Sequence, residues 1–192
     1  MKNNFYLKVL AVFMFCVVFS IGANAQNTFS KGDQNLNLGI GLGSTLGGTG
    51  YTTTIPPLSV SYEVGIKDEL FDDRSSLGIG AYLGYAANKH EWIFDASKYG
   101  FDYNYLILGA RGAVHYHLIN NLDTYAGLML GYNNISSKTF GNWGSTIGTA
   151  TASGLTWSMF LGARYYFKEN MGAFAELGYG IAYLQLGVTF RF

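Results

Sequence analysis

The chain alternates apolar residues with polar or small residues, with a period of two, in eight separate segments. Successive side chains of a β-strand point to opposite faces, so this pattern predicts strands with one apolar face. Most segments reach the roughly 9 to 11 residues that a tilted strand needs to cross a bilayer. The predicted strands cover residues 35–43, 58–66, 77–85, 105–118, 125–132, 154–167, 173–180 and 183–192.

The connectors between these segments alternate in length. The short ones comprise residues 67–74, 119–123 and 168–171, and the long ones comprise residues 44–55, 87–100 and 133–153, with one tight turn at 180–182. Short periplasmic turns and long outer loops are typical of outer-membrane barrels. With an even strand number, this asymmetry predicts an all-β fold, an eight-stranded antiparallel up-and-down transmembrane β-barrel. Pro56 and Pro57 are expected at a strand start, where a missing donor is tolerated.

The composition supports a membrane barrel over a water-soluble one. Only 12% of the residues are charged, 17% are aromatic, and the chain has 26 glycines and 2 prolines. Beyond residue 25 no apolar run reaches the length of a membrane helix, and only a closed barrel otherwise satisfies its backbone in lipid. A soluble lipocalin-like barrel is the alternative, but its outer parity would be rich in Lys and Glu, and here neither parity is.

The first 25 residues have the organisation of a secretory signal peptide. Lys2 and Lys8 bracket a short charged region, residues 9–21 form a nearly unbroken apolar run, and the small-x-small pattern at residues 23–25 predicts cleavage between Ala25 and Gln26. Residues 1–25 are therefore predicted to be removed, which leaves residues 26–192 as a single barrel domain.

Cleavage also changes the available chemistry. Cys16 is the only cysteine, so the mature chain would contain no disulfide, zinc–cysteine cluster or cysteine nucleophile. The mature chain would carry ten basic and 12 acidic residues. Nucleic-acid binding calls for a basic patch, so a nucleic-acid partner is not expected.

The last eight residues form an alternating strand that ends on an aromatic residue. Gln185, Gly187, Phe190 and Phe192 resemble the C-terminal signal by which outer-membrane β-barrels are recognised for insertion. This resemblance implies that the barrel-assembly machinery is a partner. The mature chain as a whole resembles small outer-membrane barrels of the OmpA and OmpX kind, of the porin-family domain type, and we expect no OmpA-like periplasmic peptidoglycan-binding domain after the barrel.

The resemblance implies a location in the outer membrane, in contact with its lipid and lipopolysaccharide. It further implies a non-enzymatic protein with a structural role in the envelope, or a role in surface contact through a ligand of the outer loops. Two alternatives remain: a narrow pore for ions or small solutes, and an enzyme that modifies lipid.

Charged residues inside the predicted strands all share the non-apolar parity: Glu63, Arg111, Arg164, Glu176 and Arg191. A cation that faced lipid would cost about 2 to 4 kcal/mol, so the shared parity places these charges in the lumen. They fit either a charged constriction or a packed network of mutually neutralising ions. The narrow interior of a small barrel favours packing. Glu176→Ala is therefore expected to lower stability more than it changes conductance.

The three histidines carry no complete site in the sequence. His115 and His117 share one face of a strand near its periplasmic end, without a neighbouring acid or cysteine to complete a metal site. Barrels that modify lipid A carry their catalytic histidine at the outer side, where His90 is better placed, beside Glu91 and Trp92. No serine partner accompanies His90. We therefore expect no catalytic residue, metal or cofactor.

Aromatic residues fall into two sets. Those at the ends of strands, on the apolar parity, are expected to form interfacial girdles. Those in the long connectors are expected either to recognise a ligand at the cell surface or to pack over the barrel mouth, and the sequence favours neither role. The first set is Tyr62, Tyr85, Tyr116, Trp157, Tyr165, Phe167, Phe190 and Phe192, and the second is Tyr51, Trp92, Phe94, Tyr99, Phe101, Phe140 and Trp143.

Overall fold

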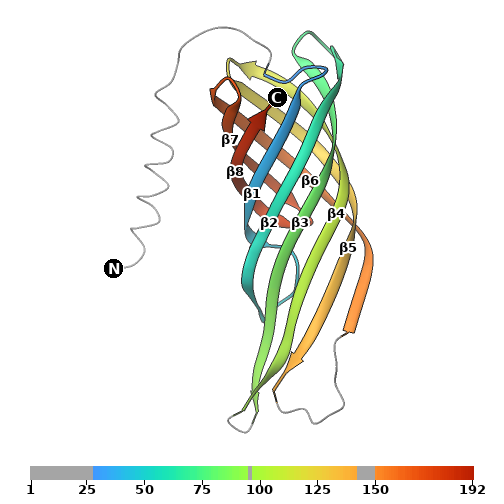
Figure 1. The fold of residues 1–192 in the computed structure, drawn as a ribbon, viewed down its shortest axis with the longest axis vertical. Helices are drawn as coiled ribbons and strands as arrows, with labels where there is room; N and C mark the ends of the chain where they lie inside the picture. The colour runs from blue at the N-terminus through green and yellow to red at the C-terminus, as the bar shows by residue number, and fades with distance from the viewer. Residues whose placement is uncertain (1–27, 95–96, 142–149) are drawn as a thin grey trace, which may run out of the picture.

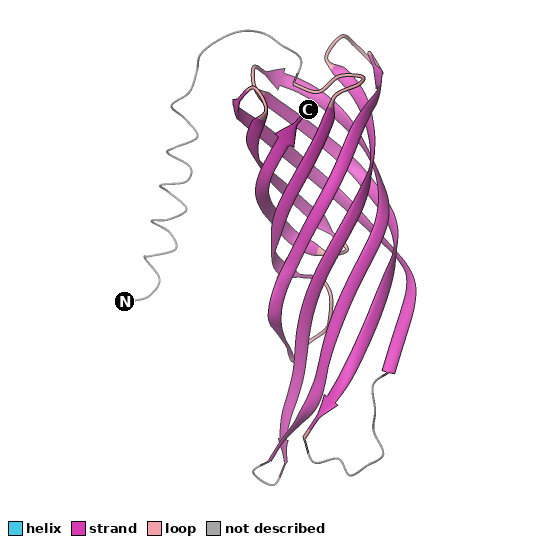
Figure 2. Cartoon of the chain, in the orientation of Figure 1, coloured by secondary structure: helices cyan, strands magenta, loops and turns pink. Residues whose placement is uncertain are grey.

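A computed structural model describes residues 28–94, 97–141 and 150–192 of the protein. The described residues form strands, turns and loops without a helix (Figure 2), so none of them forms a helix suited to crossing a membrane. The predicted signal peptide and its cleavage site at Ala25 and Gln26 lie outside these residues and stay a prediction. The strands are β1 (Gln34–Ser44), β2 (Tyr51–Asp68), β3 (Ser75–Phe94), β4 (Ser97–Ile119), β5 (Leu122–Phe140), β6 (Ala150–Lys168), β7 (Met171–Tyr179) and β8 (Ala182–Arg191).

Each strand pairs antiparallel with its neighbours in sequence, and β1 pairs with β8 to close the barrel (Figure 1). At this closure Leu36 faces Phe190, and Gly39 faces Gly187. The main-chain N–H of Phe192 extends the seam by donating to the carbonyl of Gln34 at 2.9 Å. The predicted eight-stranded antiparallel up-and-down barrel is therefore confirmed.

Polarity in the barrel is inverted relative to a water-soluble protein. Leu128 and Leu130 on the outer surface are 61% and 72% exposed, whereas Glu63 and Arg164 inside are fully buried. Large exposed apolar residues occur on every strand, and such a continuous apolar surface is stable only against lipid. The barrel is therefore built to sit in a bilayer with its charges inside.

The barrel wall has two very different heights. The strands β3 and β4 contain 20 and 23 residues, but β7 and β8 contain only 9 and 10. In Figure 1, β3, β4 and β5 continue far below the ends of β7, β8 and β1. The longer strands thus form an open sheet beyond one mouth of the closed barrel, which we call the protruding sheet: residues 51–57, 87–94, 97–104, 133–140 and 150–156.

The protruding sheet corrects the predicted long loops. Most of residues 87–100 and 133–140 are paired strand, and the first outer loop is reduced to residues 45–50. Pro56 and Pro57 lie inside β2 at a register irregularity between Ile55 and Leu58, instead of at its start. The alternation of apolar and polar residues did not predict these strand extensions, because a sheet with water on both sides needs no apolar face.

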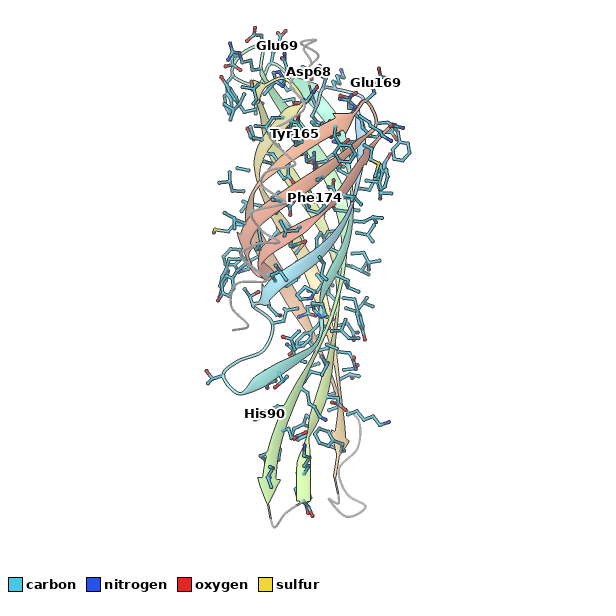
Figure 3. All side chains as sticks on the ribbon, turned by 90° about the vertical axis from the view of Figure 1, so that its left-hand side faces the viewer. Asp68, Glu69, His90, Tyr165, Glu169 and Phe174 are labelled. Carbon is cyan, nitrogen blue, oxygen red and sulfur yellow. The ribbon has the colours of Figure 1, made fainter. Side chains whose placement is uncertain are left out.

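At the opposite mouth the strands are joined by short turns. Short turns are expected on the periplasmic side, so we call this end the periplasmic mouth. Asp68, Glu69 and Glu169 lie at this end of the molecule, and His90 lies on the protruding sheet at the other end (Figure 3). The turns between strands span residues 69–74, 120–121 and 169–170. The barrel is thus polarised along its axis, with acidic turns at one end and the sheet at the other.

One residue breaks the predicted parity. Tyr183 lies two residues before Gln185 in β8 and by strict alternation would face the lumen, but it is 57% exposed and its ring lies 6.5 Å from that of Tyr179 on the outer surface. The neighbouring residue of β1, Gly43, has a left-handed φ of 68°, which interrupts the regular pleat at this end of the seam. Tyr179 in turn lies 6.1 Å from Trp157, so the three rings form an outer aromatic patch.

Candidate functional site

Two regions gather the residues able to carry chemistry or recognition. One is the lumen of the closed barrel, and the other is the protruding sheet.

Four charged side chains in the periplasmic half of the lumen form a closed ring of ion pairs. Arg164 contacts the carboxylate of Glu63 through Nη2 and donates from Nη1 to Asp123 at 3.1 Å. His115 closes the ring, with Nε2 at 2.9 Å from Glu63 and Nδ1 at 3.0 Å from Asp123. All four side chains are at least 98% buried. We call this set the ion-pair ring.

The hydrogen bonding of the ring favours a doubly protonated His115. Both imidazole nitrogens face carboxylate oxygens, and an ionised carboxylate can only accept hydrogen bonds. His115 therefore donates from both nitrogens as an imidazolium, which leaves neither nitrogen free to act as a base.

Sequence reasoning missed this arrangement. The sequence pattern places Asp123 in a periplasmic turn, but the residue belongs to β5 and points into the lumen with 1% exposure. No acid was expected beside His115, yet Glu63 and Asp123 flank it from β2 and β5. The strand register indicates the contact between His115 and Asp123. Asp123 of β5 pairs with His117 of β4, and His117 lies two residues after His115 on the same face. In the described part of the chain no three His, Cys, Asp or Glu side chains are arranged to hold a metal ion.

A second buried pair lies next to the ring. Arg111 donates to Glu176 at 2.7 Å and to Ser61 at 3.2 Å, and the Tyr125 hydroxyl donates to the same Glu176 oxygen at 2.9 Å. The ring of Tyr125 also lies 4.3 Å from the guanidinium of Arg164, which joins the two clusters. Counted together, the buried cations and anions balance: Arg111, Arg164 and imidazolium His115 against Glu63, Asp123 and Glu176.

Arg191 takes a different place from the other predicted lumen charges. Its guanidinium donates to the backbone carbonyls of Thr28 at 3.2 Å and Glu169 at 2.7 Å, at the periplasmic rim. It also lies 4.9 Å from the ring of Tyr166. The residue is thus bound to main chain, apart from the buried ion pairs.

Apolar side chains close the lumen on its outer side. Tyr82, Ile107, Met129 and Ile181 form a buried cluster against which Leu46 packs. The first outer loop is held there because the main-chain N–H of Thr45 donates to the carbonyl of Ile181 at 3.0 Å and the side-chain amide of Asn88 donates to the carbonyl of Leu46. A cavity of about 20 Å³ beside Arg111 and Glu176 has room for a single water molecule. The lumen between the ion-pair ring and this cluster is therefore packed.

The residues of the predicted insertion signal occupy the β1–β8 seam. Gln185 is buried in the lumen and accepts a hydrogen bond from Ser59 at 2.8 Å, whereas Phe192 is 73% exposed. A Cβ on Gly187 would lie 2.6 Å from the ring of Phe174, which fills the lumen behind it. Packing against Phe174 therefore explains the glycine at position 187, and recognition of this segment by the assembly machinery stays a prediction.

The outer surface of the protruding sheet changes character along each strand. On β3 the outward residues Leu83 and Tyr85 give way to Lys89, and on β5 Leu130 and Tyr132 give way to Asn134. Further along the same outer face, the carboxylate of Glu91 forms ion pairs with Lys89 at 3.2 Å and with Lys98 at 2.9 Å. The switch from aliphatic to aromatic to charged residues marks the point where the sheet leaves the membrane. About six residue steps of about 3.3 Å lie beyond it, or about 20 Å of strand.

The inner, concave face of the protruding sheet carries five connected aromatic rings. Tyr51 stacks on His90 with ring centroids 5.0 Å apart and an interplanar angle of 16°. The remaining contacts join these rings into a cycle with centroid distances of 5.3 to 6.0 Å. We call the set the aromatic face: Tyr51, His90, Trp92, Phe101 and Tyr103.

The aromatic face is built by strand register. Tyr51 of β2 pairs with His90 of β3, which pairs with Phe101 of β4 and then Thr139 of β5, so all four share one face. Burial, followed by the neighbouring Tyr51, raises the pKa of Tyr103. Lys89, Glu91 and Lys98 lie on the opposite parity. Six of the seven aromatic residues expected in outer loops therefore lie on strands. Trp143 lies outside the described residues, and for Phe94, at the end of β3, only the main chain is described.

Comparison with known proteins supports the fold. No family model and no curated protein sequence matches the chain. The structure is similar to that of Ail, the attachment invasion locus protein of Yersinia pestis, solved with the heparin analogue sucrose octasulfate. That match has 12% identity and a TM-score of 0.53, over 84% of this chain and 99% of Ail.

Two further structures show weaker similarity. The N-terminal β-barrel domain of Pseudomonas aeruginosa OprF matches with 16% identity and a TM-score of 0.48, over 84% of this chain and 98% of that one. Neisserial surface protein A matches with 11% identity and a TM-score of 0.43, over 83% and 93%. Together with the closed strand order and the apolar exterior, the match to Ail shows that this chain has the fold of the small eight-stranded outer-membrane β-barrels.

Proposed function

We propose that this outer-membrane barrel is a non-enzymatic surface-contact protein, and that its aromatic face is the contact site. The observation that carries the proposal is the position of Tyr51, His90 and Phe101, on a rigid sheet about 20 Å long beyond the membrane. Aromatic rings offer large contact areas at a small cost in conformational entropy, which makes them frequent in recognition surfaces.

The chemistry of the aromatic face favours a neutral saccharide chain as its partner. Ring faces can stack on the apolar faces of sugar rings, and the register places the hydroxyls of Ser137 and Thr139 beside Tyr103 and Phe101. The lysines of the protruding sheet lie on its convex face, where Glu91 pairs with two of them. A polysulfated ligand such as the one bound to Ail would need basic residues on the concave face, so we expect neutral glycans to bind better.

The packed lumen argues against the two alternative functions. A pore would have to open both the ion-pair ring and the apolar cluster around Met129, which would expose buried charges. His115 is not available as the base of a lipid-modifying enzyme because both of its nitrogens contact carboxylates, and His90 at the outer end stacks on Tyr51 within the aromatic face. We further propose that lipid and lipopolysaccharide contact the outer surface, and that the barrel-assembly machinery recognises the segment from Gln185 to Phe192.

Glycan-array binding of the detergent-purified protein tests the proposal, with neutral and sulfated glycans on the same array. We expect neutral glycans to bind, and Tyr51→Ala or Tyr103→Ala to weaken this binding by at least about tenfold. Lys98→Ala, on the convex face, is the matched control and should leave binding unchanged. Binding restricted to sulfated glycans and lost in the Lys98 variant would contradict the assignment of the concave face.

A further inference from the structure

The residues ahead of β1 lie inside the periplasmic mouth of the barrel. Thr28 and Phe29 are only 3% and 5% exposed, although no strand contains them. They follow the predicted first mature residue, Gln26, by two and three positions. A segment so close to a chain end is usually mobile unless specific contacts hold it.

Phe29 covers the ion-pair ring. Its ring stacks on the imidazole of His115 with centroids 4.1 Å apart and an interplanar angle of 30°. The guanidinium of Arg164 lies 5.8 Å from the same ring. An aromatic face beside two cations is a favourable contact, and here it separates both cations from the periplasm.

Polar contacts hold the segment to strands that are distant in sequence. Ser76 of β3 donates to the carbonyl of Phe29 at 3.0 Å, and the Thr28 hydroxyl lies 2.9 Å from Nδ1 of His117 on β4. Arg191 of β8 donates to the carbonyl of Thr28 at 3.2 Å. The segment thus spans the mouth and touches both early and late strands.

Two glycines leave the space that the segment fills. A Cβ on Gly65 would lie 2.1 Å from the carbonyl oxygen of Ser30, a distance that no real contact allows. A Cβ on Gly78 would lie 3.0 Å from the ring of Phe29. Gly65 also exchanges main-chain hydrogen bonds with the segment, accepting from Gly32 and donating to Asp33, both at 2.9 Å.

We propose that residues 28–33 form an N-terminal plug that seals the periplasmic mouth and completes the burial of the ion-pair ring. Because the plug contacts β8 as well as β2, β3 and β4, it docks after the barrel has closed. Its contacts are few compared with those between strands, so it opens and closes as a local unit without unfolding the barrel.

Thiol labelling of Ser76→Cys tests the plug, in a Cys16→Ser background that leaves one thiol. The exported protein is extracted in native detergent and treated with a maleimide-polyethylene glycol reagent. Asp73→Cys, in an exposed turn, gives the rate of an open site. We expect the thiol at position 76 to react at least about tenfold more slowly than the one at position 73.

Gly65→Ala should expel the plug without changing any plug residue, and raise the labelling rate at position 76 about tenfold. Gly112→Ala is the matched control, because a Cβ there meets only one atom, at 3.9 Å. Phe29→Ala provides a second route to the same result if Gly65→Ala does not fold. Heat-modifiable migration in gels reports the intact barrel. Equal rates at positions 76 and 73 in the parent, or an unchanged rate in a folded Gly65 or Phe29 variant, would overturn the proposal.

Discussion

The two ends of the barrel use the same strands in opposite ways. In the periplasmic half, β2, β4, β5 and β6 direct charged residues inward, where every carboxylate of the ion-pair ring meets a cation. Beyond the membrane the same faces of β2, β3 and β4 carry aromatic rings, and the ion-paired lysines and glutamate lie on the outer face. The comparison shows that the solvent around each face, and not strand propensity, decides where charges lie.

The difference also separates stability from recognition. A buried charge is costly when its partner is lost, whereas exposed ion pairs contribute little. The ion-pair ring should therefore dominate the stability of the barrel, and the protruding sheet should tolerate change.

The largest effect is expected from Arg164→Met. This change leaves Glu63 and Asp123 buried with only His115 as a charged partner, at a cost of about 3 to 5 kcal/mol. Urea unfolding in detergent, followed by tryptophan fluorescence, measures it. A loss below about 1 kcal/mol would show that the ring is hydrated and does not act as a buried core.

Glu176→Ala should follow closely, at about 3 kcal/mol, because Arg111 loses its carboxylate and Tyr125 its acceptor. Planar-bilayer recording should show no stable open channel in either the parent or the variant, since apolar residues still close the lumen. A large, steady conductance change with unaltered heat stability would instead favour the pore.

Two arginine substitutions on one face of β5 locate the membrane boundary. Leu130→Arg places a cation in lipid and should cost about 2 to 4 kcal/mol, whereas Asn134→Arg, four residues along the strand, should cost less than about 1 kcal/mol. Unfolding of both variants in lipid vesicles provides the measurement. Similar costs at the two positions would mean that the boundary is misplaced.

The smallest effect is expected from Lys98→Met. The hydrogen bond from Lys98, and then that from Lys89, lowers the pKa of Glu91, so their stabilisation is present above the ordinary carboxyl pKa and is lost on acidification through the lowered value. The variant should raise the pKa of Glu91 toward its ordinary value in an NMR titration, with no measurable change in unfolding. An unshifted pKa would show that Lys98 does not pair with Glu91 in solution.

The closed part of the fold could be predicted from the sequence because lipid imposes an apolar parity. Leu36, Leu38 and Ile40, for example, alternate with polar or small residues throughout the membrane. The same rule failed beyond it, where Thr52, Lys89 and Ser136 lie on strands with water on both sides. Alternation contains no information about a sheet that buries neither face.

The candidate sites were predictable only in part. Parity assigned Glu63, Arg111 and Arg164 to the lumen, but ion pairing depends on which residues of distant strands lie at the same height. Glu63 and Arg164 are 101 residues apart in the chain. The plug was missed because Thr28 and Phe29 precede the first strand and belong to no periodic pattern.

Replacing residues 90–101 with an Asn-Gly turn tests the separation of stability and recognition most directly. Lys89 and Asp102 are paired across β3 and β4, so a two-residue turn can join them. We expect a heat-modifiable barrel with the urea midpoint of the parent, despite the loss of most of the aromatic face. A barrel that unfolds at clearly lower urea would contradict this expectation, because the protruding sheet would then be part of the stable core.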